Sequence, residues 1–165
     1  MLEIKYHHLP ALIHRPFLCI SHLHRRDPTY MRLLETHPAE MLAMENVAIA
    51  EARSIARMLH NIQDVQNLVH DFPWWQMISC LICASSILVM AAVCGACQGA
   101  NKVPMIPVPG YGLAVSEDLS ELDADAETCS QVQDALSAHS NAAGLARDML
   151  SRLRSIGFRA RCRSV

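Results

Sequence analysis

Charged side chains are absent from one long stretch, Trp74 to Cys97, which reads WWQMISCLICASSILVMAAVCGAC. As a helix, its 24 residues would extend about 36 Å, at about 1.5 Å per residue. An uncharged apolar run of more than about 18 residues is also typical of a membrane-spanning helix. The stretch is therefore either a membrane span or the central helix of a soluble core.

Aromatic residues are also few: three Phe, three Tyr and two Trp stand against nine Met. The chain is 52% hydrophobic and 18% charged, which excludes disorder and permits a sizeable core. A core of Leu, Ile, Ala and Met suits helices packing on helices. We predict an all-α fold, a bundle-like array of about four to five helices with its central apolar helix near residues 74–97. The net charge of −2 argues against a generally basic, nucleic-acid-binding surface.

A secretory signal is missing from the start of the chain, where Glu3 is charged and no apolar segment precedes a cleavage site. The seven cysteines are an odd number, and several lie inside apolar runs. They are therefore typical of buried thiols in a reducing compartment and not of a disulfide framework.

Two cysteine pairs, Cys80 with Cys83 and Cys94 with Cys97, have the spacing of a zinc site. The ten residues between the pairs contain no Gly, Pro or Asn to turn the chain. A continuous helix would separate Cys80 from Cys94 by about 21 Å, whereas zinc needs all its sulfurs at about 2.3 Å. We therefore expect no metal site and no cofactor in this chain.

The first 70 residues predict three helices. Apolar residues recur every three or four positions and predict one face of a helix: Leu2, Tyr6, Leu9, Ile13 and Phe17, with Leu12 close by. Pro10 predicts a kink or a late start, and Pro16 predicts an end or a bend at Arg15. A short helix is expected over Pro28–Glu35. A long amphipathic helix is expected from Pro38 to His70, with Glu51 as a polar defect in its apolar face and Arg53 on its polar side.

The string Tyr6-His7-His8, followed by LIHRPFL from Leu12 to Leu18, resembles the fungal-specific transcription factor domain, the regulatory region of fungal zinc-cluster transcription factors. The PWW string before the uncharged helix resembles the central helix of that domain. The segment 126–157, with Cys129 near its start, resembles the closing helix. These are the motif residues, for which we expect structural roles: Tyr6, His7, His14, Arg15, Pro16, Phe17, Leu18, Pro73, Trp74 and Trp75.

In a physical interpretation of the LIHRPFL string, Leu12, Ile13, Phe17 and Leu18 are buried and Pro16 fixes a turn. Arg15 then reaches the free carbonyl groups at the helix end.

Four segments follow from these patterns. Residues 1–97 form a partial helical core, 98–125 a connector rich in Pro, Gly and acidic residues, 126–157 the closing helix and 158–165 a basic tail. The acidic residues near the end of the connector are expected to lie in a solvated loop before the helix begins.

The resemblance implies a transcriptional regulator whose N-terminal cluster of six cysteines holds zinc and binds DNA. No cysteine here matches the C-x2-C-x6-C start of that cluster, so zinc is expected only in the missing N-terminal cluster of a full-length relative. We expect a nuclear C-terminal fragment that acts as a regulatory, effector or interaction domain and does not bind DNA directly. Its expected partners are other transcription proteins or the missing part of its own domain.

Two alternatives remain. A single-pass membrane protein would span about residues 75–97, and only then would a membrane be its partner. An enzyme would need a nucleophile with its base, a phosphate-binding glycine loop or an HExxH helix. None of these is visible in the sequence, so we expect no catalytic residue and no enzymatic activity.

Overall fold

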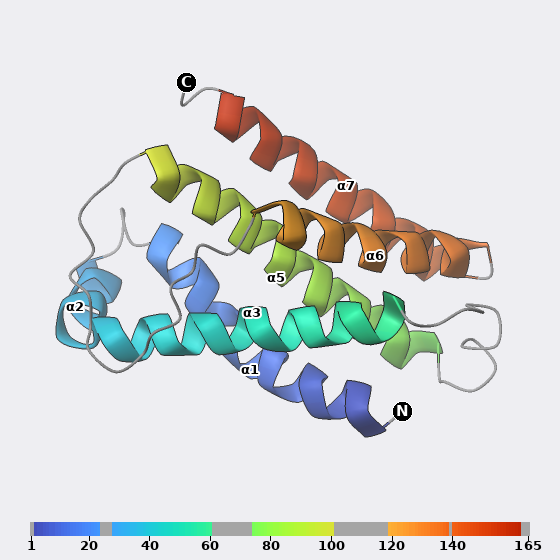
Figure 1. Cartoon of the computed structure of the whole chain (residues 1–165), viewed down its shortest axis with the longest axis horizontal. Coiled ribbons are helices and arrows are strands. Elements are labelled where there is room, and N and C mark those ends of the chain that lie inside the picture. Colours follow the sequence, from blue (N-terminus) through green and yellow to red (C-terminus); the bar gives the residue numbers. More distant parts are fainter. Residues whose placement is uncertain (1, 24–27, 61–73, 101–118, 139, 163–165) are drawn as a thin grey trace.

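A computed structural model describes residues 2–23, 28–60, 74–100, 119–138 and 140–162, and within them every regular element is a helix (Figure 1). The six helices are α1 (Leu2–Leu23), α2 (Pro28–Thr36), α3 (Pro38–His60), α5 (Trp74–Ala100), α6 (Leu119–Ser137) and α7 (Asn141–Cys162). The predicted all-α fold with a central apolar helix is confirmed.

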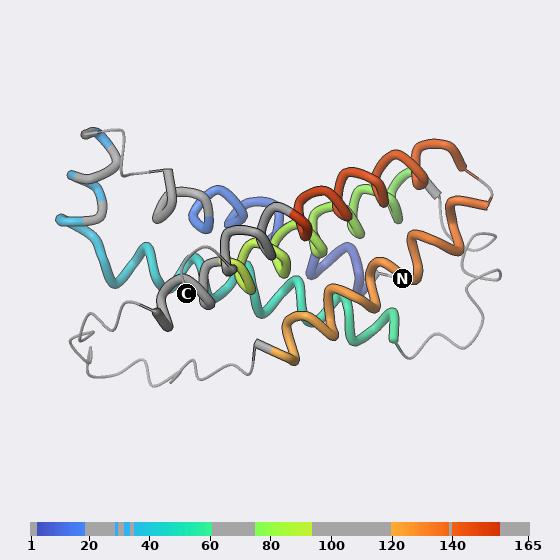
Figure 2. Tube along the Cα trace, turned by 90° about the horizontal axis from the view of Figure 1, so that it is seen from above, coloured from blue at the N-terminus to red at the C-terminus, as the bar shows by residue number. Residues whose placement is uncertain are grey.

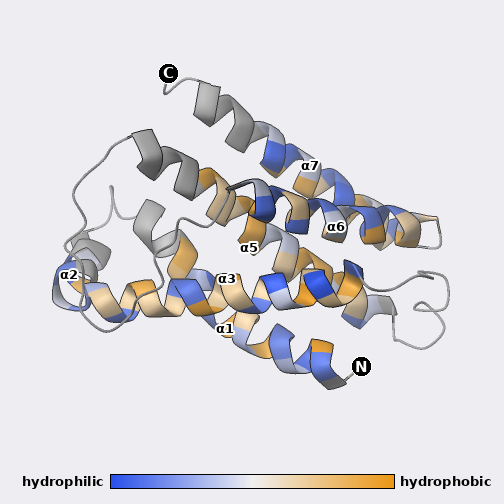
Figure 3. Cartoon of the chain, viewed as in Figure 1, coloured by the Kyte–Doolittle hydropathy of each residue, from blue (hydrophilic) through white to orange (hydrophobic). Residues whose placement is uncertain are grey.

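Helix α5 is the centre of the molecule, because it contacts α1, α3, α6 and α7. In Figure 3 the described part of α5 is largely hydrophobic, whereas α3, α6 and α7 alternate between polar and apolar residues. Among the described residues, one helical segment, Trp75–Val93, is long and apolar enough to cross a membrane. Its most apolar window is 67% buried inside this fold, so the surrounding amphipathic helices cover most of the segment.

The buried side of α5 is built from medium-sized and small side chains. They are Met77, Ile78, Cys80, Leu81, Cys83, Ala84, Ser85, Ile87, Leu88, Val89, Ala91 and Ala92. The hydroxyl of Ser85 donates a hydrogen bond to the carbonyl of Leu81, so this buried polar group is satisfied within its own helix. The small residues leave room for neighbouring helices to approach.

Proline fixes the start of two helices. Pro28 and Pro38 are the first residues of α2 and α3, where the missing N–H of proline costs no helical hydrogen bond. His37 alone joins these helices, and its backbone serves both of them. The His37 N–H donates to the carbonyl of Leu33 at 2.9 Å, and its own carbonyl accepts from the N–H of Met41 at 3.1 Å.

Helix α1 differs from its prediction, because it runs unbroken from Leu2 to Leu23 through both Pro10 and Pro16. The ribbon changes direction part-way along (Figure 1), as expected where proline removes a backbone hydrogen bond. Of the two outcomes predicted at Arg15, an end or a bend, the end is therefore wrong. Pro16 lies inside the helix and does not form a turn, and the bend was the alternative prediction.

The packing face of α1 was also predicted wrongly. The side chains that it buries are Ile4, Ala11 and Leu18, seven residues apart. Tyr6, Leu9, Leu12 and Ile13, from the predicted apolar face and the motif, are 47–73% exposed, and Phe17 is half-buried. Of the four motif residues expected to be buried, only Leu18 is. The small side chain of Ala11 lets α1 lie close to its neighbours, whereas Tyr6, Leu9 and Ile13 are exposed.

The C-terminal part forms two helices where one was predicted. Helix α6 begins at Leu119, so residues 119–125 belong to a helix and not to a connector. The carbonyl of Ser140, the residue before α7, accepts from the N–H of Gly144 at 3.2 Å. Helix α7 then continues through Gly157 to Cys162, so that glycine does not end the helix and most of the expected tail 158–165 is helical.

The covering of α5 is open on one side. Among the described helices, contacts link α1 to α3, α3 to α6 and α6 to α7, but α1 and α7 do not pack together around α5. Seen from above in Figure 2, α7 follows α5 and α6 lies beside α3. The less buried residues of α5 recur every three or four positions and mark this open side: Trp75, Ser79, Ile82, Ser86, Met90 and Val93.

Candidate functional site

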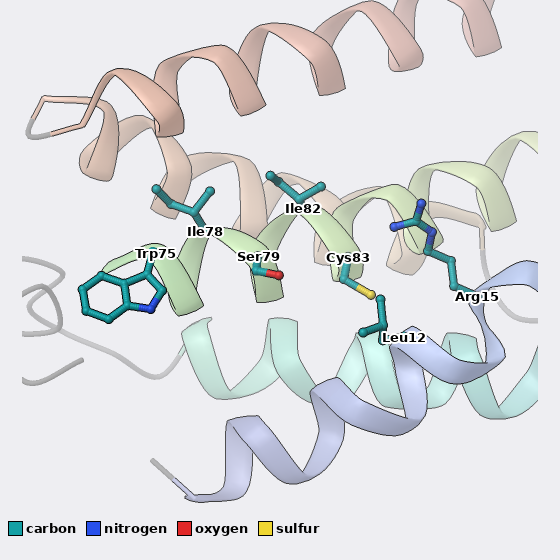
Figure 4. A pocket seen from close by; sticks show the side chains of 7 residues that line it. All are labelled: Leu12, Arg15, Trp75, Ile78, Ser79, Ile82 and Cys83. Carbon is teal, nitrogen blue, oxygen red and sulfur yellow. The ribbon is translucent and has the colours of Figure 1, made fainter. Parts of the chain in front are cut away.

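A pocket of about 240 Å³ lies between α1 and α5 at the N-terminal end of the open side (Figure 4). We call it the α1–α5 pocket, and its lining is Leu12, Arg15, Trp75, Ile78, Ser79, Ile82 and Cys83. Trp75 lies at one end and Arg15 at the other, and Leu12 faces Cys83 across the middle (Figure 4).

Helical spacing explains why these residues meet. The five residues from α5 are separated by one, three or four positions, so they share one face of that helix. Leu12 and Arg15 are three positions apart on α1. The exposed placement of Leu12 and Trp75, at 47% and 59%, keeps the pocket open to solvent.

Among the described residues of the lining, Arg15 is the one with a charged side chain. Burial raises the pKa of the Cys83 thiol, while the charge of Arg15 and a hydrogen bond between the two side chains oppose that rise. No described carboxylate forms an ion pair with Arg15. The pocket therefore combines apolar walls with one cation that an acidic side chain does not neutralise.

The structure brings only two of the predicted motif residues, Arg15 and Trp75, together in this pocket. Leu18 belongs to the core, and Tyr6 is 73% exposed. Its ring meets that of His7 edge-on, with the two centroids 5.4 Å apart. Pro73 lies outside the described residues, and Trp74 is the first residue of α5.

His14, Pro16 and Phe17 contribute to α1 itself. The His14 Nδ1 donates to the carbonyl of Pro10 at 2.8 Å, and its ring lies 6.2 Å from that of Phe17. Pro16 is exposed inside the helix.

A polar contact joins α1 to α3. One of its two residues is Glu51, the polar residue that interrupts the predicted apolar face of α3. The His7 Nδ1 lies 2.5 Å from the Glu51 Oε2, and both side chains are about one-fifth exposed, at 21% and 22%. Glu51 thus interrupts the apolar face of α3 because it faces a histidine and not an apolar side chain. The motif residue His7 therefore has a structural role, which is to join α1 to α3.

A double-mutant cycle with His7→Ala and Glu51→Ala should give a coupling free energy of about 1 kcal/mol. The expected value is modest because both groups are partly hydrated in the folded state. Urea unfolding of the four proteins measures it. A coupling free energy near zero would show that the contact does not hold α1 on α3.

Arg53 was placed on the polar side of α3, but it is 8% exposed and lies between two acids of α6. Its Nε donates to the Asp125 Oδ2 at 2.8 Å, and its Nη2 donates to the Glu121 Oε2 at 2.5 Å. The expectation that these acids lie in a solvated loop is therefore wrong. They belong to a helix, and they tie it to α3.

The same N-terminal half of α6 is also tied to α7. The Arg154 Nη1 donates to the Glu127 Oε2 at 2.6 Å, and its Nη2 donates to the carbonyl of Asp123 at 3.2 Å. Arg154 of α7 and the acidic residues of α6 are thus complementary within the fold.

The buried thiols have the character of core groups. Burial, together with the nearby carboxylate of Asp125, raises the pKa of the Cys129 thiol from 9.0 to about 12. Burial and the neighbouring Cys83 raise the pKa of Cys80 to about 11. Since the thiolate is the nucleophilic form, these side chains are poor nucleophiles at neutral pH.

Alkaline pH should destabilise the fold through Cys129. Its neutral thiol is favoured in the folded state, whereas the unfolded chain loses this proton above about pH 9. The stabilising contribution is complete below pH 9 and is lost as pH rises toward 12. Between pH 9 and 10.5 it should fall by about 2 kcal/mol. Urea unfolding gives the free energy of unfolding of the chain and of Cys129→Ala across this pH range. If both proteins lost the same amount of stability as the pH rose, Cys129 would not be the cause.

The described part of the chain offers few groups for metal binding or for thiol chemistry. No three His, Cys, Asp or Glu side chains come together there as metal ligands would. Of the cysteines in the two CxxC pairs, Cys80 and Cys83 are buried and free. The arrangement at the α1–α5 pocket is suited to binding through apolar contact and one positive charge.

Comparisons with protein-family models, with curated proteins and with solved structures gave no significant match. The resemblance to the fungal-specific transcription factor domain therefore stays a prediction from the motif residues.

Proposed function

We propose that this chain is a non-catalytic, helical regulatory or interaction region of a nuclear transcriptional regulator of the fungal zinc-cluster type. One observation carries the proposal. The two most specific resemblance segments, LIHRPFL and PWW, lie about 60 residues apart in sequence, yet Arg15 and Trp75 line one pocket. Both segments therefore contribute a residue to the same candidate binding site.

The surface around this pocket supports an interaction role. On α1, the large apolar side chains of Tyr6, Leu9 and Ile13 are 57–73% exposed and follow one another at helical spacing. Clustered exposed apolar residues are typical of surfaces that contact another protein or another part of the same protein. We call these three residues the α1 outer face.

A reporter assay tests the proposal. The full chain is fused between an unrelated DNA-binding domain and an activation segment, and reporter expression and nuclear retention are measured. We expect the chain to change reporter output by several-fold. The double variant Leu9→Glu/Ile13→Glu should abolish the change, because two charges on the α1 outer face oppose apolar contact.

The matched control is Leu145→Glu/Met149→Glu on α7. These residues are also four positions apart and exposed, at 73% and 44%, but they belong to α7, which contributes no described residue to the pocket lining. This variant should keep the effect on the reporter. Equal behaviour of the two variants, or no effect of the unmodified chain, would contradict the proposal.

The membrane-spanning alternative depends on the length and hydropathy of Trp75–Val93. It predicts that the chain stays in the membrane pellet after carbonate extraction. The proposed bundle predicts release into the supernatant with helical circular dichroism, since α5 already contacts four other helices. Retention in the pellet would replace the proposed function with the membrane alternative.

A further inference from the structure

We propose that the α1–α5 pocket binds a small, mostly apolar monocarboxylate, with the carboxylate at Arg15 and the hydrocarbon part extending toward Trp75. This inference deepens the proposed function, because such a molecule would be the effector of the regulatory region. Binding is measured on the isolated chain, so it can be found or refuted whatever the reporter assay shows.

The size of the pocket favours a small molecule. Its volume of about 240 Å³ lies just below the range of about 300–1,000 Å³ that holds drug-sized ligands. Trp75 and Cys83 are eight residues apart on α5, which makes the lined trough about 12 Å long. A macromolecular helix, about 10 Å wide, would not enter it.

The lining selects the chemical class of the ligand. Leu12, Ile78 and Ile82 offer aliphatic contact, and the Trp75 indole offers a flat aromatic surface. At the other end, the guanidinium of Arg15 presents N–H groups in a fork that fits a carboxylate. None of the described residues that line the pocket is acidic, so they offer a ligand amine no counter-charge.

Arg15 is held where this role requires it. Arg15 and Cys83 both line the pocket, and the Arg15 guanidinium is near enough for its charge and a hydrogen bond to oppose the rise in the pKa of the Cys83 thiol. A thiol is a weak hydrogen-bonding partner, so a carboxylate can replace or share this contact at little cost. By contrast, Arg53 and Arg154 already have acidic partners and are not available to a ligand.

Titration of the protein with hexanoate at pH 7.5 tests the proposal. Binding is monitored in ¹H–¹³C methyl spectra of Ile- and Leu-labelled protein and by tryptophan fluorescence. We expect saturable shifts at Leu12, Ile78 and Ile82, with a dissociation constant of about 1 mM, as suits a ligand of this size. Hexanamide, which keeps the shape without the charge, should bind about tenfold more weakly. Acetate, which keeps only the charge, should not saturate.

Three variants identify the site. Arg15→Gln should weaken hexanoate binding about tenfold and leave the weak binding of hexanamide unchanged. Ser79→Leu fills the trough from an exposed position and should abolish binding of both. Arg57→Gln, a matched change at an exposed arginine of α3, should alter neither. Melting temperatures of the variants confirm that each one is folded.

Several results would overturn the proposal. Equal affinity for hexanoate and hexanamide would show an apolar cavity without carboxylate recognition. Hexanoate binding that survives Ser79→Leu, or shifts confined to methyl groups far from α1 and α5, would place the site elsewhere. The absence of saturable shifts up to 10 times the expected dissociation constant would show that the pocket does not bind this class.

Discussion

Replacing Arg53 by Met should lower the free energy of unfolding by about 3 kcal/mol. The substitution keeps most of the apolar stem but removes the guanidinium that lies between Asp125 and Glu121, at 2.8 Å and 2.5 Å. The Asp125 side chain, only 18% exposed, then keeps a negative charge with little water to stabilise it. Urea unfolding followed by circular dichroism at 222 nm measures the loss.

The two carboxylates should contribute unequally. Asp125→Asn should cost about 1–2 kcal/mol, because a mostly buried charge-assisted hydrogen bond is weakened. Glu121→Gln should cost less than about 0.5 kcal/mol, since that side chain is 60% exposed and its ion pair is screened by solvent. Arg57→Met on the exposed side of α3 is the control. If Arg53→Met cost no more than Arg57→Met, the ion pairs would not hold α6 on α3.

Leu88→Ala should destabilise the chain by about 2–5 kcal/mol. Leu88 is fully buried on α5, the helix that all but one of the other described helices contact. The loss combines the hydrophobic transfer of the removed atoms with the cavity that they leave. Because single domains are stable by about 5–15 kcal/mol, this one substitution removes a large fraction of the total. Chemical denaturation of the purified variant gives the value directly.

The control for this substitution is Leu145→Ala on α7. Leu145 is 73% exposed, so the same chemical change should cost less than about 0.5 kcal/mol. A similar cost at both positions would show that α5 is not the packed centre of the fold. A loss of cooperativity in Leu88→Ala, with a lower denaturant slope, would show that the packing of the helices depends on this position.

Local patterns in the sequence were sufficient for the main helices. The uncharged run predicted α5, and Pro28 and Pro38 predicted the starts of α2 and α3, because these signals act within a few residues. The break between α6 and α7 was missed. It contains neither Gly nor Pro, and its one signal is Ser140, an N-cap residue type placed directly before Asn141.

The face that α1 buries could not be read from apolar spacing. Large side chains dominate a periodicity count, so Tyr6, Leu9 and Ile13 indicated the wrong side. The buried side depends on Ala11, whose value lies in its small volume and not in its hydrophobicity. Which side packs is decided by the shape of the neighbouring helices, and a single sequence does not contain that shape in local form.

The candidate site was predictable only in part. The motif strings drew attention to Arg15 and Trp75, but Ser79, Ile82 and Cys83 carry no signal of their own beyond helical spacing. The partners of Arg53 are 68 and 72 residues away in sequence. The charge complementarity between α3 and α6 is visible only once the helices lie side by side, because many acidic residues in the sequence could have been partners of Arg53.

The placement of acids along α6 sets the order in which the helices should come apart. Helix α6 adds ion pairs to its apolar contacts with the core, binding α3 through Arg53 and α7 through Arg154, whereas α1, α3 and α5 share mainly apolar contacts. Salt weakens the partly exposed ion pairs but strengthens apolar burial. At high ionic strength the α6–α7 hairpin should therefore exchange its amide hydrogens before the α1–α3–α5 unit does, as a separate cooperative step.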